Sequence, residues 1–175
     1  MVSICHLNIR SLPKHFNELC LSSDIMCHDI ICLSETWLNS SHPSSHYQIP
    51  NYTLLRKDRG SSSRGGGLAI YLKNTIVTNI PQISLSKTEC LSVEIVSNKS
   101  KICIILVYNP PSTNSWIMDD LERLFESRQF HQPTYILGDF NIDWLKKSPL
   151  KNNIEDLMNL HGLQQLVTEP TRVTR

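Results

Sequence analysis

The stretch Tyr135–Trp144, YILGDFNIDW, joins an apolar run to a set of polar side chains that begins where the run stops. The run up to Gly138 has the length and composition of a short buried strand. Asp139, Asn141 and Asp143 then follow at alternate positions. A polar turn would explain this pattern, and so would a catalytic strand end. We interpret Asp143 as a turn cap and compare the other two residues with the ends of the remaining strands.

Three other apolar runs also end in side chains that can form hydrogen bonds. Val2–Leu7 is followed by Asn8, Asp29–Ser34 by Glu35, and the run ICIILV by Tyr108. Functional sites of layered α/β proteins collect at strand ends, because a rigid core there holds together residues that are distant along the chain. We therefore predict that these residues converge with Asp139 in one site.

The periodicity of the rest of the chain predicts alternating strands and helices. Strand-like runs are Tyr52–Arg56, Gly67–Lys73, Cys90–Val96 and Lys101–Val107, the last two forming a hairpin, and Leu163–Val167 is expected to open a further strand. Helical spacing is found at Pro13–Met26, Ser115–Arg128 and Asn152–His161, with Gly162 as the stop. This mixture predicts a layered α/β domain with largely covered sheets.

Length and composition indicate a single domain over residues 1–175. The chain is 40% hydrophobic, enough for a core, and its net charge is +1, from 17 Lys+Arg against 16 Asp+Glu. That balance does not indicate a nucleic-acid binder, although a local basic patch could serve as one. No apolar stretch approaches eighteen residues, so we expect no membrane partner. The six cysteines form no Cys-x-x-Cys pair, and we interpret them as reduced, buried thiols of an intracellular protein.

The predicted site residues suit the hydrolysis of a phosphate ester. Glu35 and Asn8 offer the hard oxygen ligands that Mg²⁺ prefers, together with water and substrate phosphate. Asp139 could accept a proton from an attacking water molecule. Tyr108 and Asn141 could donate hydrogen bonds to phosphoryl oxygens or to the nucleophile. No Ser-His-Asp set, P-loop or zinc-spaced Cys/His cluster competes with this interpretation, and we expect no small-molecule cofactor.

Basic and aromatic residues near these strand ends allow two interpretations each. Arg59 and Arg64 belong to a basic group around Gly65–Gly67, which we interpret as a hairpin turn because the Walker Lys-Ser/Thr pair is missing. The basic group, whose other members are Arg56, Lys57 and Lys73, is either a solvated face or a contact to the DNA backbone, and Arg10 could assist near the site. For Trp37 and Trp144 we favour packing under loops over base stacking, and for Trp116 packing of a helix onto the core.

Five motifs in this order resemble a known family: LNIRSL, LSETWL, RGGGLAIYLK, VYNPPS and ILGDFNID. They resemble the endonuclease domain of non-LTR (LINE-type) retrotransposons. That domain belongs to the endonuclease/exonuclease/phosphatase superfamily, together with apurinic/apyrimidinic endonucleases and DNase I. The resemblance runs from residue 3 to about residue 174, and the late segment HGLQQLVTEPTRVT resembles the same lineage.

The resemblance implies a four-layered α/β sandwich, two β-sheets flanked by helices, that nicks DNA with Mg²⁺, or with Mn²⁺ in its place. Glu35 matches the metal-binding glutamate, and Asn8 matches the asparagine after the first strand. Tyr108 matches the tyrosine that contacts the scissile phosphate, while Asp139 and Asn141 match the pair that positions and activates water. A reverse transcriptase domain would accompany this domain in a full element, and a DNA substrate implies residence in the nucleus.

The family pattern also includes a later aspartate in a motif like Ile-Asp-His-Ile and a final Ser-Asp-His, neither of which this sequence contains. We therefore expect a fold that is incomplete at its C-terminal edge and a weak or inactive nuclease. Two alternatives stay open. One is another phosphodiesterase of the superfamily, acting on phosphoinositides or sphingomyelin, and the other is a non-catalytic retroelement remnant that binds nucleic acid or a partner.

Overall fold

The protein is described by a computed structural model over residues 2–60, 65–81, 83–97, 100–111, 116–126 and 132–171. The first sheet has the order β1-β2-β4-β3 and the second the order β5-β6-β7-β8. The strands of the first sheet are β1 (Ile4–Asn8), β2 (Ile30–Ser34), β3 (Tyr52–Lys57) and β4 (Leu68–Lys73). Those of the second are β5 (Thr78–Asn79), β6 (Glu89–Ser97), β7 (Ser100–Tyr108) and β8 (Thr134–Asp139).

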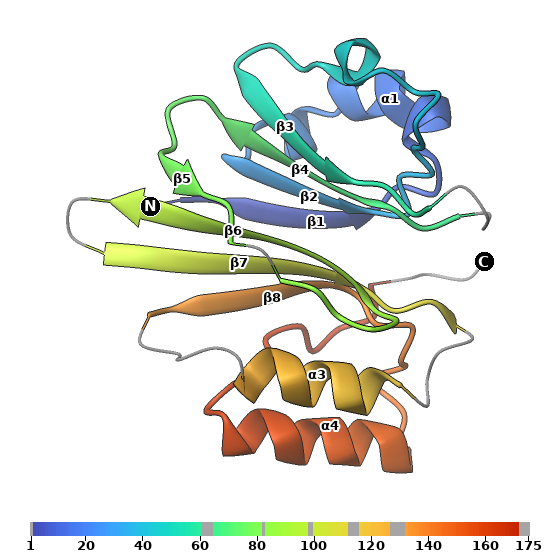
Figure 1. The fold of residues 1–175 in the computed structure, drawn as a ribbon, viewed down its shortest axis with the longest axis vertical. Coiled ribbons are helices and arrows are strands. Elements are labelled where there is room, and N and C mark those ends of the chain that lie inside the picture. Colours follow the sequence, from blue (N-terminus) through green and yellow to red (C-terminus); the bar gives the residue numbers. More distant parts are fainter. Residues whose placement is uncertain are drawn as a thin grey trace.

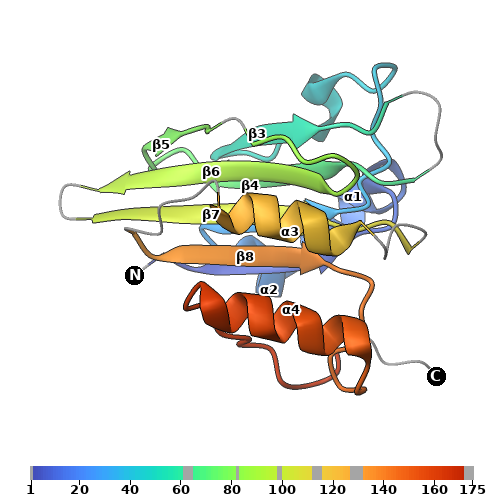
Figure 2. The same ribbon diagram turned by 60° about the horizontal axis from the view of Figure 1, so that its bottom comes forward.

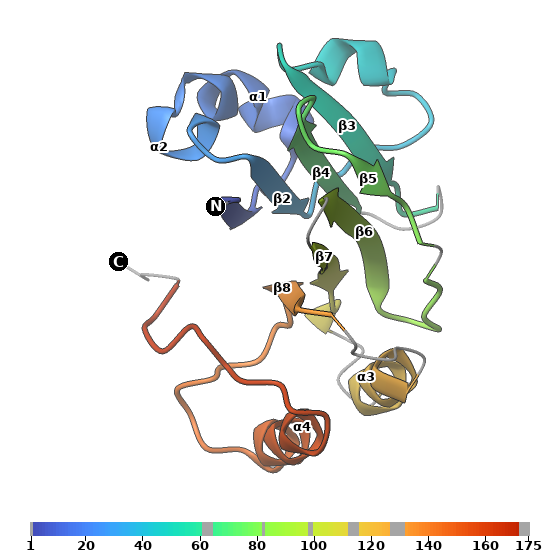
Figure 3. The same cartoon turned by 90° about the vertical axis from the view of Figure 1, so that its left-hand side faces the viewer.

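Helices cover the outer face of each sheet, which completes four layers. The helices are α1 (Leu12–Leu21), α2 (Ser23–Met26), α3 (Ile117–Glu126) and α4 (Pro149–Leu160), and a 3₁₀ helix, η1, spans Ser44–Tyr47. Figure 1 shows α1 above the first sheet and α3 and α4 below the second. Figure 2 shows α3 in front of the second sheet and α4 alongside it, below β8, and Figure 3 shows the same layers from the side. The predicted sandwich architecture is confirmed.

The core consists of three apolar layers, which follow from the alternation of side chains along each strand. Ile31 and Leu33 of β2 face α1, whereas Ile30 and Cys32 of the same strand face the second sheet. All five residues of β2 are buried, as expected for a strand covered on both faces. A third layer lies between the second sheet and the helices α3 and α4. The layer that contains Ile30 and Cys32 is shared by both sheets and fixes their relative position.

Two parallel pairs set the position of the site. β1 pairs with β2 in parallel, with Asn8 opposite Ser34, and β7 pairs with β8 in parallel, with Tyr108 opposite Asp139. Carboxyl ends of parallel neighbours meet at the same edge of a sheet, so each pair delivers its terminal polar residues together. The remaining neighbours in both sheets are antiparallel, including the predicted β6–β7 hairpin.

Some predicted elements differ from the structure. The single helix expected at Pro13–Met26 is two, because Ser22 has extended dihedral angles (φ −78°, ψ 101°) and ends α1. The strand expected at Leu163–Val167 is wrong, since that segment pairs with no strand within the described residues, and Leu166 is 70% exposed. Gly162, with φ 66°, follows α4 as predicted. No described helix is long and apolar enough to cross a membrane.

Two expectations about burial are also wrong in part. Cys32, Cys90 and Cys103 are buried, as predicted. Cys20, on α1, and Cys27, in the turn after α2, are exposed, and Cys5 is half-buried because β1 is an edge strand. Trp116 precedes α3 and is 49% exposed rather than packed into the core. Its ring instead lies 5.9 Å from the Lys87 ammonium group.

Asp120 anchors the segment before β6 to α3. The carboxylate is buried and accepts hydrogen bonds from the backbone N–H groups of Ser86 (2.8 Å), Lys87 (3.0 Å) and Thr88 (2.8 Å). The Ser86 hydroxyl donates a fourth at 2.7 Å. Burial alone would raise the pKa of Asp120, but these hydrogen bonds outweigh it and lower the pKa to about 2. The sequence placed Asp120 only within the helix expected at Ser115–Arg128, with no sign of this anchoring role.

Asp120→Asn should therefore lower the free energy of unfolding, by about 2 kcal/mol at neutral pH. Because the folded-state pKa lies below the ordinary value, this contribution is present above about pH 4 and is lost as the pH falls toward about 2. Urea unfolding at pH 7 and pH 3 measures both effects, and the difference between wild type and variant should shrink at the lower pH. The exposed neighbour Asp119 provides the control variant Asp119→Asn. Equal losses for the two variants would contradict this account.

Candidate active site

The side-chain amide of Asn8 joins two carboxylates that are far apart in the sequence. Its Nδ2 atom donates to Glu35 Oε1 at 2.8 Å and to Asp139 Oδ2 at 2.7 Å. Asn8 ends β1, Glu35 follows β2 and Asp139 ends β8, so this amide connects the edges of the two sheets. The predicted convergence of these three strand ends is confirmed. Their catalytic and metal-binding roles remain predictions.

Tyr108 lies beside this cluster. It ends β7, it pairs with Asp139 across the parallel ladder, and it is 4% exposed. Burial, to which the negative charge of Glu35 adds, raises the pKa of Tyr108 to about 12. The hydroxyl therefore keeps its proton at neutral pH and is available as a hydrogen-bond donor.

Arg59 covers one face of the Tyr108 ring. The guanidinium carbon lies 5.4 Å from the ring centroid, and Arg59 Nε forms an ion pair with Glu89, the residue opposite Tyr108 on β6. Glu89 also accepts a hydrogen bond from the backbone N–H of Gly67 at 2.6 Å. Arg59 Nη2 is buried and has no hydrogen-bond partner among the described residues. Arg59 is therefore a fixed, paired cation beside the site and not part of a solvated face.

The glycine run lies along the segment that carries Glu35. Its residues have left-handed φ angles, 84° at Gly65, 74° at Gly66 and 85° at Gly67. A Cβ atom on Gly66 would lie 2.3 Å from the Arg59 side chain, and one on Gly67 would lie 2.5 Å from Thr36 Oγ1. These glycines lie in the connection between β3 and β4. They pack closely against Arg59 and Thr36, which the interpretation as a hairpin turn did not predict.

Strained backbone is concentrated around the site. Among the described residues, five of the six non-glycine residues with positive φ flank it, namely Arg10, Ser11, Glu35, Trp37 and Asn141. Such conformations cost on the order of 1 kcal/mol each and persist where the surroundings fix them. Hydrogen bonds supply that fixation: Ser11 N donates to Glu35 O (2.9 Å), and the Asn141 N–H donates to Asp139 Oδ1 (2.9 Å).

Asn141 and Asn109 cross-link the segments after β7 and β8. Asn141 Nδ2 donates to the Asn109 carbonyl at 2.7 Å, and Asn109 Nδ2 donates to the Phe140 carbonyl at 3.0 Å. The exposed Asn141 thus braces the loop that carries Asp139, and its predicted role toward water is untested. Sequence reasoning missed Asn109, whose one signal was its place directly after Tyr108. The predicted turn cap at Asp143 is confirmed by its bond from Leu145 N (3.1 Å).

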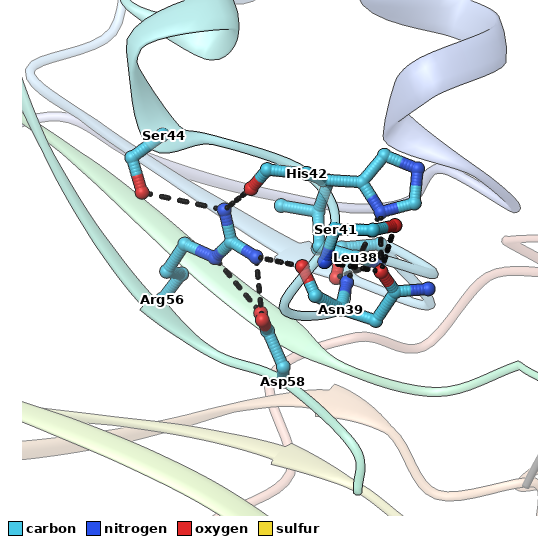
Figure 4. A network of polar contacts seen from close by, with 8 residues as sticks. Leu38, Asn39, Ser41, His42, Ser44, Arg56 and Asp58 are labelled. Carbon is cyan, nitrogen blue, oxygen red and sulfur yellow. Dashed lines mark hydrogen bonds and ion pairs between the residues drawn. The ribbon is translucent and has the colours of Figure 1, made fainter. Parts of the chain in front are cut away.

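The other basic residues differ in their surroundings. Arg56 is held inside the fold, where its guanidinium group donates to the carbonyls of Asn39 (2.9 Å) and His42 (2.7 Å) and pairs with Asp58 (Figure 4). Lys57 Nζ donates to the Cys90 carbonyl at 3.1 Å. Arg10 is exposed next to Asn8. Arg64, predicted to contact DNA, lies outside the described residues.

The two carboxylates form a donor set that suits a hard divalent cation. Mg²⁺ takes one or two carboxylates and completes its shell with water and substrate phosphate. Within the described residues no group of three or more His, Cys, Asp or Glu side chains could hold a metal. Glu35 is the carboxylate predicted to bind the cation, and Asp139 shares the Asn8 amide donor with it. Asn8 Oδ1 accepts from Arg10 N at 3.2 Å, and Asn8 would have to turn its amide to become an oxygen ligand.

The two sheets and their covering helices define a class of fold, the four-layered α/β sandwich. The chain belongs to the endonuclease/exonuclease/phosphatase family, whose profile matches residues 5–171. Members of this family are nucleases and phosphatases, which supports an enzyme. No curated protein sequence matches the chain.

Solved structures support the same fold. The endonuclease domain of TRAS1, a telomere-specific non-LTR retrotransposon, is similar with a TM-score of 0.70 at 10% identity, covering 93% of this chain and 71% of that one. An AP endonuclease from Archaeoglobus fulgidus has a TM-score of 0.66 at 17% identity, with coverages of 91% and 71%. A 3′ phosphatase from Neisseria bound to a product DNA hairpin has a TM-score of 0.61 at 17% identity, also covering 91% and 71%.

Proposed function

We propose that this chain is a Mg²⁺-dependent DNA endonuclease domain of retrotransposon origin, which hydrolyses a phosphodiester to nick target DNA. The observation that carries the proposal is the Asn8 amide held between Glu35 and Asp139, at 2.8 and 2.7 Å, beside the buried Tyr108. Two carboxylates that share one amide donor repel each other, and a cation held by Glu35 would relieve that repulsion.

Each side chain has a distinct part in the proposed reaction. A bound Mg²⁺ would neutralise charge that develops on the phosphate. Glu35 would hold the cation. Asn8 would be a second ligand, or its amide would fix the positions of the two carboxylates. Asp139 accepts the proton of the attacking water, and Asn141 holds the Asp139 loop in place. Tyr108, protonated at neutral pH, donates to a phosphoryl oxygen.

A DNA substrate is supported by the similar structures and by the motifs. One similar structure is the endonuclease domain of a retrotransposon, one is an AP endonuclease, and one holds a product DNA hairpin. The exposed Arg10 is a donor that could reach a backbone phosphate, whereas Arg59 Nη2 is buried and would have to move to do so. In a full element, a reverse transcriptase domain would use the nick, and the site of action would be the nucleus.

Plasmid nicking tests this function directly. The chain should convert supercoiled plasmid to the nicked form with Mg²⁺ or Mn²⁺, slowly because the sequence lacks the Ser-Asp-His motif of the family. Chelation by EDTA should stop the reaction. The double variant Glu35→Gln/Asp139→Asn, purified in the same way, measures contaminating nuclease. Hydrolysis of phosphoinositide and sphingomyelin under the same conditions measures the alternative substrates.

The outcomes separate the candidate functions. Nicking by the wild-type chain alone, without lipid hydrolysis, supports the endonuclease. Lipid hydrolysis without nicking would reject it in favour of another phosphodiesterase of the family. If the chain unfolds cooperatively on heating but shows neither activity, the non-catalytic remnant is the interpretation that remains.

A further inference from the structure

Trp37 lies at the site with much of its ring exposed. The residue is 42% exposed, although large aromatic side chains are usually mostly buried. Its indole Nε1 donates to Glu35 Oε2 at 3.3 Å, the oxygen that Asn8 does not contact. Both oxygens of the candidate metal ligand thus accept a side-chain hydrogen bond, and one of the two donors is a solvent-facing aromatic ring.

The backbone holds Trp37 in this position. Its φ angle is 56°, a left-handed value that is rare for a bulky residue. Its N–H donates to the Gly66 carbonyl at 2.9 Å, and a Cβ atom on Gly65 would lie 3.5 Å from Nε1. Trp37 is therefore pinned by the glycine run at an unfavourable backbone angle while its ring stays outside the apolar core.

The other aromatic rings at these strand ends are less exposed than Trp37. Tyr108 is buried under Arg59. Phe140 and Trp144 pack edge to face, with ring centroids 6.2 Å apart, against the layer between the second sheet and its helices. Among the described aromatic residues that follow β1, β2, β7 and β8, Trp37 is the one whose ring is free to meet a ligand and also touches a candidate catalytic carboxylate.

We propose that Trp37 contacts the substrate, stacking its ring on a nucleobase next to the scissile phosphate while its N–H orients Glu35. This inference rests on the proposed function and narrows its substrate class. Every nucleobase has a flat π-face, so stacking would hold nucleic acid without sequence preference. A lipid phosphodiester has no such face, so this contact would favour DNA over lipid at the same carboxylates. The sequence favoured packing of Trp37 under a loop, but its 42% exposure favours contact with a ligand instead.

Two substitutions separate the ring from its N–H group. Trp37→Phe keeps an aromatic face but removes the donor to Glu35, so the Kd for DNA should change little while kcat falls about tenfold. Trp37→Ala removes both, so the Kd and the KM should also rise about tenfold or more. Equal Kd values for the Phe and Ala variants would overturn the stacking role, and an unchanged kcat in Trp37→Phe would overturn the positioning role.

Tryptophan fluorescence reports the contact itself. In the variant Trp116→Phe/Trp144→Phe, Trp37 is the one remaining tryptophan of the three in the chain. A labelled duplex oligonucleotide is titrated in Ca²⁺, so that binding is read by anisotropy and stacking by quenching of Trp37. Inorganic polyphosphate, which has the charge but no bases, is the matched ligand. We expect strong quenching by DNA and little by polyphosphate.

The outcomes distinguish this inference from the proposed function. DNA binding without quenching would overturn the Trp37 role and leave the endonuclease intact. Binding and quenching without any nicking by the wild-type chain would support Trp37 as a nucleic-acid contact and reject catalysis. Absence of binding would overturn both. If the double variant is unstable, the ¹⁹F NMR shift of fluorotryptophan at Trp37 in the wild-type sequence, assigned with Trp37→Phe, gives the same readout.

Discussion

Replacing Asp139 with asparagine should lower the kcat for plasmid nicking by about 10³-fold, the scale of a lost general base. Asparagine has nearly the same shape, and its oxygen can still accept from Asn8 Nδ2 or from the Asn141 N–H, the two donors that Asp139 binds at 2.7 and 2.9 Å. It cannot accept a proton from water. The KM for DNA should therefore change far less than kcat.

Asp143→Asn is the matched control for this variant. Asp143 lies four residues further along the same loop, is exposed, and caps a turn through Leu145 N. We expect nicking within about twofold of wild type, because substitutions of exposed residues away from special features have small effects. If both variants lost activity equally, the loss would reflect disruption of the loop and not removal of a base.

Glu35→Gln should raise the Mg²⁺ concentration for half-maximal nicking by about 100-fold. The substitution removes a charged ligand, and it also disturbs the surrounding hydrogen bonds. Both oxygens of Glu35 accept, Oε1 from Asn8 and Oε2 from Trp37. Glutamine has a single oxygen, so one of these contacts would place a donor against a donor. Saturating Mg²⁺ should restore part of the activity, which Asp139→Asn would not show.

Glu155→Gln provides the corresponding control. Glu155 lies on α4, away from the strand ends, and pairs with Lys151 at 3.4 Å. Its substitution should leave the Mg²⁺ dependence unchanged. A parallel shift in both variants would indicate a general loss of surface charge, and an unchanged Mg²⁺ dependence in Glu35→Gln would remove Glu35 from the metal site.

The strand ends could be predicted from the sequence because each apolar run stops at one residue. Glu35, Tyr108 and Asp139 stand directly at such stops, and the parallel pairs β1–β2 and β7–β8 bring their ends to common edges. The helix break at Ser22 and the absence of a strand at Leu163–Val167 were not predictable in this way. Helical spacing continues across Ser22, and an apolar run does not reveal whether a partner strand lies beside it.

Contacts between distant elements were the part that the sequence could not provide. The Asn8 amide bridges two sheets, and the offset of the sheets depends on how their inner side chains interdigitate. Arg59 and Arg56 looked alike as members of one basic group, yet one stacks on Tyr108 and the other ties down the loop at Asn39. The contact partners of such residues can be assigned only from the three-dimensional structure.

Cation binding tests the central claim most directly, because Glu35 is proposed to hold the cation and Asp139 to act as the base. Mn²⁺ binding, followed by electron paramagnetic resonance, is compared for wild type, Glu35→Gln, Asp139→Asn and the double variant. If Glu35 holds the cation and Asp139 acts on water, wild type should bind one Mn²⁺ at the site, Glu35→Gln should lose most of that affinity, and Asp139→Asn should keep most of it. The double variant should lose little more than Glu35→Gln. Full Mn²⁺ affinity in Glu35→Gln, or an equally large loss in Asp139→Asn, would contradict this division of roles.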